Sequence, residues 1–223
     1  LLNRSSDLAM VDYANVSFAH QAFTNTYAPL AQLKLLYEEA LSVPDIVGIV
    51  IGTRPDCMPD ELLDYLAELN EQTFVLVEYG VESTNDETLL RINRGHTFQQ
   101  SCDAIERTHQ RGLLTCAHII LGLPGEDADE SLRQAPVISG LSIDILKIHQ
   151  MQIIRGTRLA ELYAAKPFHI YTVDEYIRLI AEYIQRLRPD MVLERFVSQS
   201  PKDLLIAPHW GLKNYECTNL MVN

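Results

Sequence analysis

The sequence predicts an α/β protein built on a parallel sheet. Apolar, partly β-branched runs alternate with amphipathic helical runs, and the turns between them are short. One run, over residues 113–121, leads into a Gly-Leu-Pro-Gly-Glu turn that cannot continue a strand. Repeated strand–helix units of this kind favour either a barrel or an open, doubly wound sheet. A dinucleotide-binding sheet is disfavoured, because the chain has no Gly-x-Gly-x-x-Gly turn.

The composition is that of a soluble globular protein. Hydrophobic residues make up 47% of the 223 positions and charged residues 22%, which suits a sizeable core. The net charge of −12 argues against a protein that holds nucleic acid by bulk electrostatics. No apolar run approaches the roughly 18 residues of a membrane span, and no signal peptide opens the chain. We therefore expect a cytoplasmic protein without a membrane partner.

The first part of the chain contains three strand–helix units. Strands are predicted where β-branched and aromatic residues cluster, and helices where leucines recur at helical spacing. Pro29 suits the first turn of one helix, and Asp60 and Glu61 favour the start of the next. The predicted order is strand 11–21, helix 30–41, strand 46–51, helix 59–69, strand 73–80 and helix 87–92.

The second part continues the alternation and then loses it. Thr97 is predicted to cap one helix, and Thr172 forms a capping box with Glu175 at the start of another. The predicted order is helix 98–111, strand 113–121, helix 127–140, strand 143–153, helix 158–165, helix 173–187 and strand 191–197. Beyond residue 198 no pattern is clear. We expect a core over residues 1–199 and an irregular tail over residues 200–223.

Five ionisable residues lie within or at the ends of predicted strands, namely Glu78, Glu82, His118, Lys147 and His149. Side chains alternate between the faces of a strand, so Glu78 shares a face with Glu82, and Lys147 shares a face with His149. Charged groups inside a core are costly unless they are paired, which favours a shared ligand site at the strand ends. Structural roles remain open, with Glu82 as a helix cap, His118 as a core imidazole and Lys147 paired with Glu78.

Arg94 and the cysteines are weighed separately. Arg94 follows a helical turn, where its guanidinium could reach a carboxylate or a ribose, although a surface arginine is the alternative. The cysteines are far apart and show no zinc or iron–sulfur spacing, so we expect small buried side chains at Cys57, Cys102, Cys116 and Cys217.

Several short motifs occur in a characteristic order, at residues 23–28, 52–56, 78–83, 92–96, 122–126, 146–149 and 154–157. Together they resemble the radical S-adenosylmethionine (SAM) superfamily over roughly residues 12–210. Within it, the chain is similar to a bacterial group of uncharacterised Fe–S oxidoreductases. That group is similar to the Elongator catalytic subunit and, more distantly, to oxygen-independent coproporphyrinogen oxidase.

The resemblance implies a fold, a chemistry and two cofactors. The fold is a partial (β/α)6 barrel of the TIM type. The cofactors are SAM and a [4Fe–4S] cluster held by three cysteines in Cys-x3-Cys-x2-Cys or a close variant. Reductive cleavage of SAM yields a 5′-deoxyadenosyl radical that abstracts hydrogen from a substrate. The catalytic residues stay unassigned.

The same resemblance implies cofactor-binding residues on four strand ends. Residues 24–26 fall where relatives meet the amino group of SAM, although Thr24, Asn25 and Thr26 depart from the usual Gly-Gly-Glu. Glu82 and Arg94 match residues that hold the ribose and the carboxylate. His118 matches a polar contact to SAM, and the turn beside the adenine corresponds to Gly122, Leu123 and Pro124. Lys147 and His149 match the substrate side, and Glu78 completes the candidate set.

One departure from the family pattern is decisive, because the chain contains no cysteine triplet. We therefore expect a fragment that lacks the first barrel strand and the cluster loop, binds SAM weakly, holds no cofactor and performs no radical chemistry. Two other readings stay open. One is a metal-free α/β enzyme with Glu78 or Glu82 as base and His118 or His149 as acid. The other is a non-catalytic interaction domain.

The expected partners follow from the resemblance and from the missing strand. The substrate is unidentified and is either a small molecule or an RNA. An electron donor such as flavodoxin or ferredoxin is implied. A missing barrel strand would leave an open sheet edge, through which two copies of the chain could pair as a homodimer.

Overall fold

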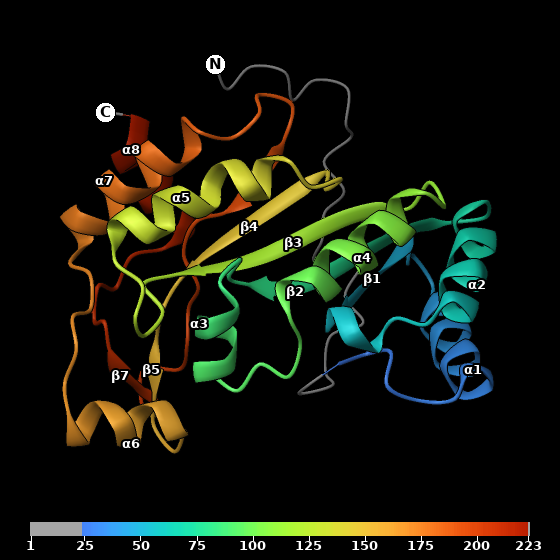
Figure 1. Ribbon diagram of the computed structural model, residues 1–223. Helices are drawn as coiled ribbons and strands as arrows, with labels where there is room; N and C mark the ends of the chain where they lie inside the picture. The colour runs from blue at the N-terminus through green and yellow to red at the C-terminus, as the bar shows by residue number, and fades with distance from the viewer. Residues whose placement is uncertain (1–23, 223) are drawn as a thin grey trace.

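The computed structural model describes residues 24–222, so the strand expected over residues 11–21 lies outside the described residues. Its centre is a five-stranded parallel sheet with the order β1-β2-β3-β4-β6 (Figure 1). The strands are β1 (Gly48–Thr53), β2 (Phe74–Glu82), β3 (Leu114–Leu121), β4 (Ile145–Gln150) and β6 (Val192–Arg195). In the part of the chain described, β1 and β6 form the two edges of this sheet.

The helices follow the predicted strand–helix alternation. They are α1 (Leu30–Leu41), α2 (Asp60–Asn70), α3 (Asp86–Arg91), α4 (Phe98–His109), α5 (Ala128–Ser139), α6 (Arg158–Ala165), α7 (Val173–Ile184) and α8 (Asn214–Val222), with a 3-10 turn, η2, at Pro55–Cys57. The capping box at Thr172 is confirmed, and Thr97 caps α4 through a second capping box. These caps satisfy backbone N–H groups that have no partner inside the helix.

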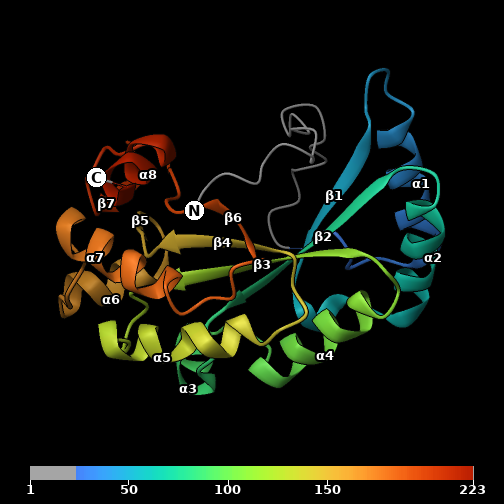
Figure 2. The ribbon, with the colours of Figure 1, turned by 90° about the horizontal axis from the view of Figure 1, so that it is seen from above.

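The strands of the sheet lie side by side in the same order as they occur in the chain. Helices α4 and α5 lie on the same side of the sheet (Figure 2). A doubly wound sheet would place helices on both sides and reverse its strand order. The observed order is that of consecutive units in a (β/α) barrel, left open between β1 and β6 within residues 24–222. The expected partial barrel is therefore confirmed.

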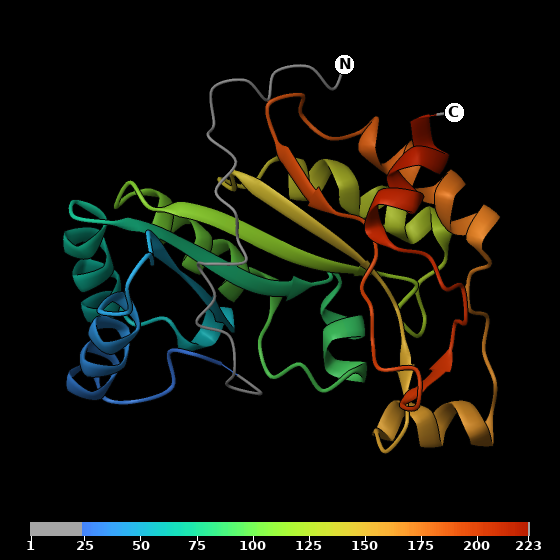
Figure 3. The same ribbon diagram turned by 180° about the vertical axis from the view of Figure 1, so that it is seen from behind.

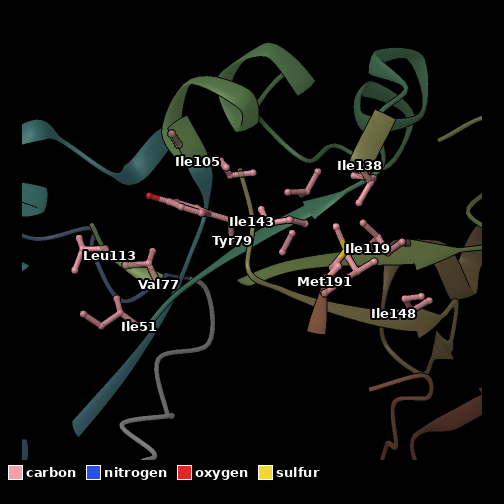
Figure 4. Close-up of a cluster of buried hydrophobic side chains, with 14 of the residues drawn as sticks. Ile51, Val77, Tyr79, Ile105, Leu113, Ile119, Ile138, Ile143, Ile148 and Met191 are labelled. Atoms are coloured by element: carbon pink, nitrogen blue, oxygen red, sulfur yellow. The ribbon is translucent and has the colours of Figure 1, made fainter. Parts of the chain in front are cut away.

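The two faces of the sheet carry different residues. The face toward the helices forms the main core, in which Ile51, Val77 and Ile119 pack with residues of α4 and α5 (Figure 4). Tyr79 belongs to this face, and its hydroxyl lies 2.7 Å from Thr108 Oγ1 on α4. The alternate residues of the same strands point to the opposite face. Toward the amino ends of the strands, that face carries a small apolar cluster of Leu76, Cys116 and Ile145. Toward their carboxyl ends, it becomes polar.

A second, smaller layer covers the carboxyl end of β3 and β4. It consists of β5 (Ile153–Ile154), β7 (Leu205–Ala207) and α6, which lie together in Figures 1 and 3. β5 and β7 pair in antiparallel fashion. Their cluster is built on Leu123, Met151 and Ile153, so it packs against the turn that follows β3.

Two expectations about this region are wrong. The strand predicted over residues 143–153 is divided, because β4 ends at Gln150 and β5 begins at Ile153 with a different partner. The tail after residue 198 is not irregular throughout, since it contains β7 and α8. β7 forms only because β5 supplies its pairing groups, and α8 packs on α7 with Cys217 buried. Strands of two or three residues carry too little periodicity to be recognised.

The core gives a direct test of the fold. Leu62 on α2 is fully buried, whereas Leu90 on α3 is 82% exposed. We expect Leu62→Ala to lower the free energy of unfolding by about 2–5 kcal/mol, since it removes buried methyl groups and leaves a cavity. Leu90→Ala, the same substitution at the surface, is expected to change it by less than about 0.5 kcal/mol. Urea titration followed by circular dichroism measures both, and equal losses would contradict this arrangement of α2 and α3.

Candidate active site

The end of β2 departs from regular pairing. Gly80 pairs with His118 and Glu82 pairs with Ile119, so Val81 is an extra residue and the strand contains a bulge. Glu82 has a φ of 66°, which is uncommon for a residue with a side chain. Its carboxylate still lies on the Gly80 side, because a Cβ on Gly80 would come 2.7 Å from Glu82 Oε1.

Arg94 meets Glu82 at this point. Arg94 Nη2 lies 2.8 Å from Glu82 Oε1 and donates a hydrogen bond of 3.1 Å to the carbonyl oxygen of Gly80. A side chain at Gly80 would overlap this guanidinium, so glycine is what permits the close approach. Burial raises the pKa of the Glu82 carboxyl, and the charge of Arg94 opposes that shift.

The loop that carries Arg94 is braced from the β1 side. Gly95 has a φ of 82°, and a Cβ there would come 3.0 Å from Arg54 Nη2. Arg54 forms an ion pair with Asp56, whose Oδ1 lies 4.0 Å from Nδ1 of the buried His96. Burial lowers the pKa of His96, and the charge of Arg94 lowers it further. His96 is therefore a neutral, buried support for the loop.

The turn after β3 is fastened to the same region. Gly122 and Gly125 both have positive φ, at 85° and 93°. Arg91, the last residue of α3, donates a hydrogen bond of 2.7 Å to the carbonyl oxygen of Pro124. Glu126 accepts a 2.5 Å hydrogen bond from the hydroxyl of Ser83, directly after Glu82. The turn and the end of β2 are thus tied together.

Leu123 serves a different purpose from its neighbours in this turn. Its side chain is buried in the apolar cluster with Met151 and Ile153. Only its backbone is therefore available at the edge of the sheet, and its packing holds the turn in place.

Residues 24–26 run beside the end of β1. The amide of Asn25 donates to the carbonyl oxygen of Gly52 at 3.1 Å, and the Thr24 and Thr26 hydroxyls lie 2.6 and 2.5 Å from Thr53 Oγ1. Thr26 is buried and donates to the carbonyl oxygen of Cys57 at 2.6 Å. The three predicted residues therefore lie at the strand end next to that of Glu82. The hydroxyls of Thr24 and Thr26 already have partners, whereas Asn25 Oδ1 is buried and has none among the described residues.

A cavity of about 490 Å³ opens next to this strand end, between residues 26–29 and 56–59. Its walls include Asp56, Cys57 and the exposed ring of Tyr27. This volume falls within the range of small-molecule sites.

Farther down the polar face, Glu78 is the centre of a second group. Its Oε1 is paired with the Lys147 ammonium, and its Oε2 lies 3.2 Å from His118 Nε2. Lys147 also lies 3.1 Å from Glu194 Oε1, on β6. The His118 and His149 rings are 5.4 Å apart between centroids. The structure thus brings together the four residues predicted on β2, β3 and β4.

The ionisation of this group follows from its contacts. Burial alone would raise the pKa of Glu78, but His118 and Lys147 outweigh burial and lower it to about 2. Burial would lower the pKa of Lys147, yet the nearby carboxylates raise it overall. Burial, together with the positive charges around it, lowers the pKa of His149 to about 3. At neutral pH the group holds a charged Glu78–Lys147 pair beside a neutral His149.

Two chemical roles are poorly suited to Glu78. Both of its oxygens are engaged and its pKa is low, so it is a weak general base, which counts against the metal-free enzyme built on Glu78. Glu78, Cys116 and His118 place possible ligand atoms within 4.8 Å of one another. The Lys147 ammonium already supplies the cation at Glu78, and burial raises the pKa of the Cys116 thiol well above its usual value. The group therefore fits an ion pair better than a metal ion.

Sequence comparison identifies the family. The model of the radical SAM superfamily matches residues 12–133, more than half of the chain, and the model of the radical SAM C-terminal domain matches residues 143–223. The chain belongs to the radical SAM superfamily. No helix within residues 24–222 has the length and apolar character needed to cross a membrane.

Relatives and solved structures agree with this assignment. The uncharacterised protein YtqA of Bacillus subtilis is 37% identical over 196 residues, which is 88% of this chain and 61% of the relative. Protein YhcC of Escherichia coli is 36% identical over 191 residues, 85% of this chain and 62% of that protein. The chain thus spans about three fifths of the length of these relatives. Human Elongator complex protein 3 is 28% identical over 152 residues, 66% of this chain and 27% of that protein.

The solved structures support the fold. Elp3 of Methanocaldococcus infernus, solved with an N-terminal deletion, has a TM-score of 0.65 at 24% identity over 72% of this chain and 38% of that chain. Coproporphyrinogen III oxidase of Escherichia coli, described as a radical SAM enzyme, has a TM-score of 0.55 at 20% identity over 73% and 37%. Both resemblances expected from the motifs are therefore confirmed at the level of fold.

Sequence reasoning missed two contributors to this candidate site. Glu194 completes the Lys147 group from β6, and a charged residue inside an apolar strand is the same signal that singled out Glu78. Arg91 braces the turn after β3 through a backbone carbonyl. No sequence pattern marks such a contact, because it depends on how α3 packs beside the turn.

The Glu78 contacts predict an acid-dependent stability. The folded pKa of about 2 lies below the ordinary glutamate value of about 4.3, so the ionised carboxylate stabilises the fold above about pH 4.3. That contribution is lost as the pH falls through about 2. We expect the difference in the free energy of unfolding between wild type and Glu78→Gln to shrink over this range, as measured by urea titration.

Glu71→Gln, at an exposed position after α2, is the matched control for this measurement. Its difference from wild type should stay small throughout. A Glu78→Gln difference that does not change with pH would contradict the Lys147 and His118 contacts.

Proposed function

We propose that this chain forms the SAM-binding and substrate-facing wall of a radical SAM enzyme. The observation that supports this most is the Glu82–Arg94 pair, which lies over Gly80 beside the turn after β3. A carboxylate accepts hydrogen bonds from ribose hydroxyls, and a guanidinium pairs with a carboxylate. The two side chains therefore suit the nucleoside part and the amino-acid part of SAM.

The geometry around this pair fits such a ligand. Arg94 Nε is buried and has no hydrogen-bond partner among the described residues, so one donor of the guanidinium is free. The missing side chain at Gly80 leaves room for the guanidinium of Arg94 and the carboxylate of Glu82 directly over the backbone. In the proposal, Glu82 holds the ribose, Arg94 the carboxylate and the backbone of residues 122–124 the adenine. His118 reaches the same ligand from β3, and residues 24–26 reach its amino group.

The described cysteines do not fit the second cofactor of the family. Cys116 and Cys217 are buried, and burial raises the pKa of both thiols, to about 11 for Cys217. An iron–sulfur cluster needs cysteine thiolates. Within residues 24–222 no three cysteines lie close together. The one group of possible metal ligands there has Cys116 as its only cysteine. We place no cluster ligand in this part of the chain.

The chemistry of the proposal is that of the family. In radical SAM enzymes, SAM at an iron–sulfur cluster supplies a 5′-deoxyadenosyl radical that removes hydrogen from the substrate. The residues described here bind and orient. Arg91 and Ser83 hold the turn and the strand end in register, and Lys147 and His149 face the substrate from β4. The substrate, small molecule or RNA, and the electron donor are those of the whole enzyme.

Gly80 offers a selective test of the SAM site. Gly80→Ala places a methyl group where Arg94 Nη2 lies, so the guanidinium must move. Losing one charge-assisted hydrogen bond of about 1.5–3 kcal/mol predicts a roughly 10- to 100-fold weaker SAM affinity. Equilibrium dialysis with labelled SAM on the reconstituted full-length protein measures it.

The control for this test is Gly140→Ala, at the end of α5. There a Cβ meets only ordinary contacts of 3.5 Å or more, and the affinity should stay unchanged. Equal affinity in all three proteins would remove Arg94 from the proposed site.

The 223-residue chain alone is expected to bind SAM weakly and to release no 5′-deoxyadenosine, because it contains no cysteine triplet for the cluster. Anaerobic incubation with iron, sulfide, dithionite and SAM, followed by chromatography, tests this directly. The reconstituted full-length protein is the positive control and should release 5′-deoxyadenosine. Release by the chain alone at the same rate would refute this part of the proposal.

A further inference from the structure

A second bulge lies at the other side of the polar face, in β6. Leu146 pairs with Leu193 and Lys147 pairs with Arg195, so Glu194 is the extra residue. Bulges redirect side chains and are common beside active sites. Here the bulge brings Glu194 Oε1 to 3.1 Å from the Lys147 ammonium. A carboxylate on an edge strand thereby joins the group centred on Glu78.

Some polar atoms of this group have hydrogen-bond or ion-pair partners, and others have none. Both oxygens of Glu78 have partners, in Lys147 and His118. Glu194 Oε2 and His149 Nε2 are buried and have none among the described residues. A buried polar atom without a partner is costly, and a charged one more so. Both atoms belong to residues near Lys147, since Glu194 contacts its ammonium through Oε1 and His149 follows it by two residues on the same face of β4.

The charges define what could satisfy these atoms. Two carboxylates, Glu78 and Glu194, share the Lys147 ammonium, which can balance only one of them. His118 is a second partner of Glu78, whereas Glu194 has no other ion-pair partner among the described residues. His149 is neutral, because burial and nearby positive charges lower its pKa to about 3. A neutral imidazole nitrogen and a carboxylate oxygen can both accept hydrogen bonds. Arg195 is also near, but its side chain is exposed, where solvent and salt screen its charge.

We propose that Glu194 and His149 bind a primary amino group of the substrate. A protonated amine has three N–H donors, so one donates to Glu194 Oε2 and a second to His149 Nε2. Its positive charge also offsets the charge left over on the carboxylates. This inference rests on the proposed function in one respect, that the amine belongs to the substrate of a radical SAM enzyme. The amine site itself requires neither SAM nor a cluster.

The test uses propylammonium as the probe and the full-length protein labelled at its histidine rings. Propylammonium should shift the His149 imidazole signals in NMR spectra saturably at neutral pH and constant ionic strength. Tetramethylammonium, which has the same charge but no N–H donor, should not. The His149→Asn variant identifies the signals. Equal shifts with both cations, or no saturable shift, would overturn the proposal.

Two variants locate the site. Glu194→Gln keeps the shape of the side chain but removes the charge. We expect the affinity for propylammonium to fall about tenfold or more. Glu61→Gln, at an exposed position on α2, should bind as the wild type does. The other histidine signals report whether each variant is folded. Unchanged binding in folded Glu194→Gln would assign the amine elsewhere and overturn the proposal.

SAM dialysis on the same samples separates this inference from the proposed function. Propylammonium binding with no SAM binding keeps the amine site and refutes the SAM site. SAM binding with no propylammonium binding keeps the SAM site and refutes the amine site.

Discussion

On the side of the sheet away from the helices, charged residues of three strands share a half-buried surface, and the Glu78–Lys147 ion pair holds them together. Glu78 is on β2 and Lys147 is on β4, so the pair reaches across β3, which lies between them. Two strand spacings are about 10 Å, a gap that only two long side chains on a concave surface can bridge. His118, from β3, fills the middle. Removing one partner of such a buried pair typically costs about 3–5 kcal/mol, because the other charge is left alone.

The two bulges explain how a regular sheet presents irregular chemistry. In β2 the extra residue is followed by Glu82 in a left-handed backbone conformation, which turns its carboxylate toward Arg94. In β6 the extra residue is Glu194 itself, which meets Lys147. Strict alternation would already put Glu82 on the same face as Glu78. The bulges change the directions of these side chains, so that one carboxylate meets Arg94 and the other meets Lys147.

Much of the fold could be predicted from the sequence, because local signals specify it. The caps at Thr97 and Thr172 and the apolar runs placed the helices and the main strands within a few residues. Alternation predicted that Lys147 and His149 share a face of their strand, and the concentration of ionisable residues at strand ends predicted a shared site with Glu78 and His118. Regular pairing of β2, β3 and β4 at these positions brings the four residues together.

The remaining features depend on pairing between distant segments. The bulges are set by register with a neighbouring strand, and Gly80 in β2 is the one residue in these two strands whose type suggests a bulge. The division of residues 143–153 arises because β5 pairs with β7, about fifty residues later. Thr26 was expected to face a ligand, yet its hydroxyl is used by Thr53 and the carbonyl oxygen of Cys57. Tertiary contacts of this kind override the local signal.

Helix α3 is only six residues long. The helix and the loop after it carry two arginines, which donate hydrogen bonds to backbone carbonyl groups of different segments. Arg91 holds the carbonyl oxygen of Pro124 after β3, and Arg94 holds that of Gly80 on β2. Because only two residues lie between them, a shift of the backbone at one arginine also moves the other. A displacement of this one short segment would break both hydrogen bonds at once, so the segment couples the position of the turn after β3 to that of the end of β2.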